Sequence, residues 1–209
     1  MKLLLFIILT LFFVSCNSQQ SESPSPNLEK GRLTGNTYFN DYFGFQLRID
    51  TPWHILNENE LSQLMNERSN MLNKDTNNKF AIANGVEILL SLAMDTIKTM
   101  PHVLISLLEI KMFPQIKNEK DYLENYLRQV NKMYEGYDVK ITSTEIKQEK
   151  LNSRTFFTTL ITIEADNFHA IQKRYSLKIK DKLLNLMTNY DSDFYQDKCM
   201  HILNNIKWK

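Results

Sequence analysis

The sequence has few of the residues that build rigid or reactive sites. Of its 209 residues, two are cysteine, five are glycine and five are proline. Two cysteines are too few for a disulfide framework, and five glycines leave little material for a phosphate-binding loop. An excess of basic residues is also missing, with 25 Lys and Arg against 24 Asp and Glu. A dedicated nucleic-acid binder is therefore not expected.

What the sequence does have is enough apolar residue for a core and one short hydrophobic run. Hydrophobic residues make up 43% of the chain, which excludes wholesale disorder. The run covers Leu3 to Val14 and follows Lys2. As a helix it would rise about 18 Å, less than the roughly 30 Å hydrocarbon core of a bilayer. We therefore predict a signal peptide over residues 1–15, with a buried strand as the less favoured alternative.

The end of this run resembles a bacterial lipobox. Phe13-Val14-Ser15-Cys16 has the small residue and the cysteine of that motif, and Asn17-Ser18-Gln19-Gln20 resembles the start of Bacteroidetes-type lipoproteins. The resemblance implies that Cys16 is lipidated, for example with palmitate, and becomes the first mature residue. An ordinary signal cleaved near residue 15 is the alternative. Because Asn17 is not the retention aspartate of enterobacterial lipoproteins, an outer-membrane destination in a Gram-negative cell envelope is expected.

Composition then divides the rest of the chain into a tether and one domain. Residues 17–35 are rich in Ser, Pro, Gln and Gly, so residues 16–35 are predicted to be the lipidated cysteine and a disordered tether. Residues 36–209 contain no Pro- or Gly-rich break and no internal repeat. A single domain is the simplest interpretation.

Hydrophobic periodicity predicts strands and three helices in this domain. Asn57 and Glu60 have the spacing of a helix cap, and Asn118 precedes a second helical stripe. The expected strands cover residues 38–41, 45–50, 86–94, 103–112, 137–148, 154–164, 168–180 and 183–190, and the expected helices cover 58–73, a segment opening at 118, and 193–206.

The strand patterns predict the fold class. Val86, Ile88, Leu90, Leu92 and Met94 are expected on one face of a strand, yet Leu89 and Ala93 on the other face are apolar too. Strands that are apolar on both faces must be covered on both faces. We therefore expect an α/β (α+β) fold, with a mostly antiparallel sheet of about six to seven strands between helices, an α/β/α sandwich.

Two segments resemble the PsbP/Mog1/DcrB-like superfamily. Residues 38–47, followed by Pro52-Trp53, resemble its opening aromatic strand, Gly-Phe turn and second strand. Residues 151–157 resemble its later hairpin, with Ser153 where glycine is usual. The resemblance implies a PsbP/Mog1-like domain over 36–209 and the same layered fold. It also implies work that is mostly non-catalytic and based on binding proteins.

Motifs of catalysis and metal binding are missing from the sequence. The four histidines are far apart, and neither a His-Glu-x-x-His nor a Cys-x-x-Cys motif occurs. No Gly-x-Ser-x-Gly nucleophile motif is present either. We therefore expect no enzyme, no metal and no cofactor. Cys199 is interpreted as a small buried hydrophobic residue rather than a reactive thiol.

Two groups of residues are candidates for binding. Arg174, Lys178 and Lys180 alternate with apolar residues, so one face of their strand is expected to be cationic. That face suits anionic head groups or an acidic partner, and a solvated edge strand protected by charge is the alternative. The second group is a tyrosine stripe that forms either a core face or an aromatic ledge, made of Tyr122, Tyr126, Tyr134 and Tyr137.

Together these features predict a lipid-anchored envelope protein with a non-catalytic binding or assembly-assisting domain. Its expected partners are the membrane, through the N-terminal lipid, and an envelope protein, with no nucleic acid. The alternative is a small-ligand binder or carrier, with a pocket between sheet and helix lined by Phe156, Phe157 and Tyr175.

Overall fold

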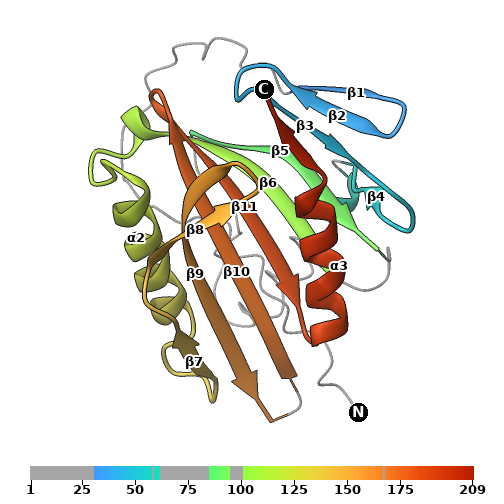
Figure 1. The fold of residues 1–209 in the computed structure, drawn as a ribbon. Helices are drawn as coiled ribbons and strands as arrows, with labels where there is room; N and C mark the ends of the chain where they lie inside the picture. The colour runs from blue at the N-terminus through green and yellow to red at the C-terminus, as the bar shows by residue number, and fades with distance from the viewer. Residues whose placement is uncertain (1–30, 58, 62–84, 95–100, 167) are drawn as a thin grey trace.

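The structure is a computed structural model and describes residues 31–57, 59–61, 85–94, 101–166 and 168–209. Most of the described chain forms two antiparallel sheets (Figure 1). The smaller sheet has four strands in the order β1-β2-β3-β12. These strands are β1 (Arg32–Thr34), β2 (Thr37–Asn40), β3 (Phe45–Arg48) and β12 (Ile206–Trp208).

The larger sheet has eight strands, and its main path is β4-β5-β6-β11-β10-β9-β7, with β8 also paired to β9. Every strand pair described in it is antiparallel. The strands are β4 (His54–Ile55), β5 (Val86–Ala93), β6 (His102–Glu109), β7 (Lys140–Ser143), β8 (Lys147–Leu151), β9 (Arg154–Ala165), β10 (Phe168–Ile179) and β11 (Lys182–Tyr190).

The helical elements are few in the described residues. They are the 3-10 helix η1 (Ile110–Met112), α2 (Glu119–Met133) and α3 (Asp193–Asn204). Asn118 caps α2, because its side chain accepts a hydrogen bond of 2.9 Å from the Asp121 N–H. The predicted Asn57 cap is confirmed, since Asn57 and Glu60 bond each other's backbone N–H at 3.0 and 2.8 Å. Beyond residue 61, the helix predicted over 58–73 lies outside the described residues.

The apolar side chains of the larger sheet enter separate clusters on its two faces. In β6, Val103, Ile105 and Leu107 join a cluster with α3 and the smaller sheet. Leu104 and Leu108 join a cluster with the first turns of α2. A further cluster packs the later turns of α2 on β9. Because neighbouring strand residues point to opposite faces, this division is what the two-sided apolar pattern requires.

The predicted fold class is confirmed in its coarse form only. The fold is mixed α+β with mostly antiparallel sheets. The expected single sheet of about six to seven strands is instead two sheets of four and eight strands. In the described part of the chain, one α-helix packs on each face of the larger sheet, α2 on one and α3 on the other, and neither helix covers its face alone. The smaller sheet shares one face with α3, and β12, which the sequence pattern did not predict, completes it.

Three predicted boundaries or faces are corrected. Segment 137–148 is divided between β7 and β8, which pair with different parts of β9. Residues Arg32–Thr34 of the predicted tether form β1 and pair with β2. In β5, the register shifts between Ile88 and Leu90, so Ile88 packs with the α2 cluster and Leu90 with the α3 cluster. A bulge adds one residue and reverses the faces that follow it.

Candidate functional site

One end of the fold gathers residues from five distant parts of the chain. It contains the β2–β3 turn, η1, the beginning of α2, the β10–β11 turn and the residue after β12, as Figure 1 shows. Exposed lysines are what these segments share, and we call this surface the basic end. It is formed by Lys111, Lys117, Lys120, Lys178, Lys180 and Lys209.

Tyr42 connects the two sheets at the basic end. Its hydroxyl donates a 3.1 Å hydrogen bond to Asp181 Oδ1 in the β10–β11 turn. The Nζ atoms of Lys180 and Lys182 lie 5.1 and 5.3 Å from the centroid of its ring, within reach of a cation–π interaction. Burial and then Asp181 raise the pKa of Tyr42 to about 12. The phenol therefore remains a neutral donor at physiological pH.

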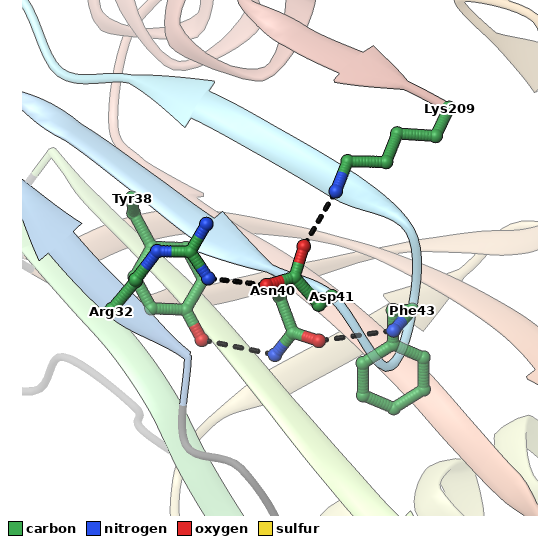
Figure 2. Close-up of polar contacts among 6 residues, drawn as sticks. All are labelled: Arg32, Tyr38, Asn40, Asp41, Phe43 and Lys209. Carbon is green, nitrogen blue, oxygen red and sulfur yellow. Dashed lines mark hydrogen bonds and ion pairs between the residues drawn. The ribbon is translucent and has the colours of Figure 1, made fainter.

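Asp41 is bonded by Arg32 of β1 and by Lys209, the residue that follows β12 (Figure 2). Lys209 Nζ donates to its Oδ1 at 2.5 Å, and Arg32 bonds its Oδ2. These bonds, that of Lys209 most of all, lower the pKa of the Asp41 carboxyl. The neighbouring Asn40 accepts a 3.0 Å bond from the Phe43 N–H, which fixes the turn. The Asp41 carboxylate of this turn is therefore paired with two cations, Arg32 and Lys209.

Glu109 is the buried acid of the basic end, with only 6% of its surface exposed. Lys182 Nζ lies 3.4 Å from its Oε1, and Lys111 Nζ lies 3.0 Å from its Oε2. Burial alone would raise the pKa of Glu109, but the two ammonium groups outweigh it and the pKa is lowered. Its negative charge is therefore neutralised by lysines of the same fold.

The beginning of α2 is bonded to the end of β10. Glu119 Oε1 accepts a 2.7 Å bond from the Lys178 N–H, and Lys178 Nζ donates a 3.1 Å bond to the Lys117 carbonyl. Acidic side chains at this end therefore bond to groups of the same fold. The ammonium groups of Lys117 and Lys180 form no ion pair among those described for residues 31–57, 59–61, 85–94, 101–166 and 168–209, and both residues are exposed. The result is a surface that presents positive charge.

Of the three predicted binding residues, Lys178 and Lys180 lie at the basic end and Arg174 does not. Arg174 is only 2% exposed and lies beneath α2. Its Nε donates to Gln172 Oε1 at 2.9 Å, its Nη1 donates to Tyr122 OH at 3.2 Å, and its guanidinium lies 3.4 Å from the ring centroid of Tyr126. The predicted cationic strand face is therefore wrong at this position.

The alternative interpretation as a solvated edge strand is wrong as well. β10 lies between β9 and β11, and it pairs with both over most of its length. Lys173 is partly buried and bonds Glu149 at 2.7 Å, on the face opposite to Arg174. Alternation along the strand separated the two faces correctly, but it carried no information on what covers each face.

The tyrosine stripe of α2 is a core face. Tyr122, Tyr126 and Tyr134 are 1 to 3% exposed, whereas Tyr137, which follows the helix, is 45% exposed. The aromatic pocket proposed as an alternative is not assembled. Phe156 and Tyr175 belong to the α3 cluster and form an edge-to-face pair, whereas Phe157 packs with the α2 cluster.

The described residues contain no feature of a metal site, a reactive thiol or a membrane-spanning helix. Within the described ranges, no group of three or more His, Cys, Asp or Glu side chains is placed to hold a metal ion. Cys199 is fully buried, and burial raises the pKa of its thiol. No helix in the part of the chain that the structure describes is long and apolar enough to cross a membrane. Cys16 lies outside the described residues.

Sequence reasoning missed most of the basic end. Lys111, Lys117, Lys120 and Lys209 belong to no alternating basic stretch of the sequence, and Tyr42 appears there only as part of an aromatic motif. The one feature of the sequence that could have located them is that these lysines lie in or next to the segments that connect the predicted strands and helices. In an antiparallel sheet, turns that follow every second strand lie at the same end. Cations placed in such turns therefore gather even when they are far apart in the chain.

Comparisons with known proteins identify the fold. No family model matches the chain, and no curated protein matches it in sequence. The solution structure of cyanobacterial PsbP (CyanoP) from Synechocystis sp. PCC 6803 superposes with a TM-score of 0.53 and 11% identity. The match covers 86% of this chain and 98% of that chain. The chain therefore has a PsbP-like fold, as the resemblance of residues 38–47 and 151–157 implied.

Proposed function

We propose that this chain is a lipid-anchored bacterial envelope protein whose PsbP-like domain binds a protein partner or assists assembly without catalysis. The observation that carries the proposal is the likeness in fold to a PsbP structure, which covers 86% of this chain and 98% of that chain. A fold by itself does not determine function, but the superfamily that this sequence resembles works mostly by binding proteins.

Two further observations support this proposal. The sequence Phe13-Val14-Ser15-Cys16 resembles a lipobox, which would attach the domain to a membrane. The most conspicuous buried polar group, Arg174, bonds to Gln172 and Tyr122 of the same fold. Such internal bonds favour a structural role over a reactive one.

The experiment is in-cell crosslinking with mass spectrometry, comparing the full chain with its Cys16→Ala variant. The proposal expects a specific envelope protein that is crosslinked to the unaltered chain and lost or reduced in the variant. An amine-reactive reagent also maps the contact, because exposed lysines occur both at the basic end and elsewhere, as at Lys132. If neither form is crosslinked to any envelope component, the interaction proposal fails. A mature mass without lipid would contradict the anchoring.

A further inference from the structure

The basic end lies where the chain enters the fold. Arg32 opens β1 and bonds Asp41, which also accepts from Lys209. The next residue, Tyr42, bonds the β10–β11 turn. The segment that leads back to Cys16 therefore joins the fold beside the exposed lysines.

The charge of the opposite end has the other sign. That end contains the turn after α2, the β9–β10 turn and the beginning of α3. Its connections carry more exposed acids than exposed lysines, with Glu135, Asp138, Asp166, Asp191 and Asp193 against Lys132 and Lys140. The described fold is thus polarised along its strands, with the basic end nearest to the chain entry.

From this geometry we propose that the domain docks on an anionic lipid surface through the basic end. The inference rests on the anchoring part of the proposed function. Fifteen residues separate Cys16 from Arg32, and fully extended they reach about 55 Å. Turning the opposite end to the membrane would take up roughly 40 Å of this reach, the length of the twelve-residue β10. The segment could still span that distance, but only nearly extended, at a large cost in conformational entropy. The tether therefore favours the end that already carries the complementary charge.

Chemistry at this surface suits head groups. Lys117, Lys178 and Lys180 are exposed, and Lys178 Nζ bonds the Lys117 carbonyl. Met112 is 50% exposed and belongs to η1, whose first residue, Ile110, donates its N–H to the Asp181 carbonyl in the β10–β11 turn. Each basic residue close to an anionic membrane strengthens the attraction about fivefold, so three lysines give on the order of 100-fold. An exposed thioether at the same surface can enter the interfacial region without burying a charge.

The test uses the full lipidated chain in vesicles and two reporter positions. A fluorophore is attached through Met112→Cys at the basic end or through Phe194→Cys at the opposite end, where Phe194 is 62% exposed. The vesicles contain phosphatidylglycerol with phosphatidylcholine, or phosphatidylcholine alone, together with a lipid that has a quencher on its head group. Buried Cys199 is not expected to take the label.

We expect quenching of the label at 112 to be several-fold stronger than at 194, and only in vesicles with phosphatidylglycerol. Lys117→Gln combined with Lys180→Gln should weaken binding about 25-fold and bring quenching at 112 most of the way toward its level in phosphatidylcholine. The matched control combines Lys132→Gln with Lys140→Gln, two exposed lysines away from this end, and should change nothing. A circular dichroism melt identifies any variant that fails to fold.

Several outcomes would overturn the inference. Equal quenching at both positions means no preferred orientation, and equal quenching in both lipids means that charge does not drive contact. Crosslinks from Lys178 or Lys180 to an acidic protein, with no quenching, would assign the basic end to a protein partner. If Cys16 carries no lipid, flotation of the unlipidated chain with vesicles tests docking separately from anchoring. Selective flotation with phosphatidylglycerol vesicles that depends on Lys117 and Lys180 would sustain docking while anchoring fails, and its absence would refute both.

Discussion

At the residue scale, Arg174 shows how a buried cation is accommodated in this fold. Its guanidinium donates to Gln172 and to Tyr122, and it stacks over Tyr126. All four residues are at most 2% exposed. Buried polar groups are costly unless their hydrogen bonds are made. These bonds therefore fix how α2 lies on β10, and each partner depends on the others.

We predict that Arg174→Met lowers the free energy of unfolding by about 2–3 kcal/mol, because it leaves buried hydroxyl and amide groups without their partner. The measurement is chemical denaturation followed by circular dichroism. Lys178→Met is the control on the same face of β10, and because Lys178 is exposed its effect should be within about 0.5 kcal/mol. Equal losses in the two variants would contradict the role given to Arg174.

The sequence showed Arg174 and Lys178 as equivalent members of one stripe. The period of two correctly placed them on one face of β10. What differs is the helix over Arg174, which belongs to a segment about 50 residues earlier in the chain. Whether a strand residue is buried depends on elements that are distant in the sequence. The alternating pattern therefore could not distinguish the buried, hydrogen-bonded Arg174 from the exposed Lys178.

At the element scale, the two described α-helices begin differently. Asn118 at the start of α2 makes a side-chain bond to the Asp121 N–H. Ser192 occupies the corresponding position before α3, but its side chain makes no capping bond. It donates instead to the carboxylate of Asp191 at 3.2 Å. Only the first of these side chains satisfies a free backbone donor of its helix.

We expect Asn118→Ala to reduce stability by about 1 kcal/mol, the usual cost of losing a helix cap. Ser192→Ala should cost clearly less, since no capping bond is lost. Thermal melts of both variants beside the unaltered chain measure the difference. If the serine variant is the more damaged one, the account of the two caps is incorrect.

Elements with a clear local signal could be predicted from the sequence. The Gly44 hairpin, the cap of α2 and strands β9 to β11 agree with their predicted residues to within a few positions. The bulge near Leu89 could not, because Ile88, Leu89 and Leu90 are three consecutive apolar residues and their pattern does not show which of them faces which side. β12 is only three residues long, too short for any periodicity. Such elements are determined by their partners rather than by their own pattern.

At the scale of the whole molecule, Cys199 reports on the integrity of the core. It is fully buried in the α3 cluster. Burial disfavours the thiolate, which is the reactive form. Reaction with an external reagent therefore requires the core to open.

With Cys16→Ser leaving one thiol, we predict that Cys199 reacts at least about 1000-fold more slowly in the native protein than in denaturant, since folded proteins open to an extent of 10⁻³ or less. Absorbance with a thiol-exchange reagent gives both rates. Met112→Cys, at an exposed position, is the control and should react quickly without denaturant. Rapid modification of Cys199 in the native state would show that α3 opens by itself.

The basic end is formed by segments from the whole length of the described fold, which explains why little of it could be predicted from the sequence. Lys178 and Lys180 were identified because they are close together in the sequence. The contact between Tyr42 and Asp181 joins residues 139 positions apart. Locating the basic end therefore required the topology that brings the connections of both sheets together.

Arg32 and Lys209 both bond the Asp41 carboxylate, which places the two ends of the described chain close together. The two ends of the described fold are neighbours, so a short peptide from Lys209 to Arg32 would close the fold into a ring. New ends could then be cut at the exposed turn around Gly136, between α2 and β7. A circular permutant of this kind would keep every strand pair and hydrogen-bond ladder while exchanging which part of the chain is made first.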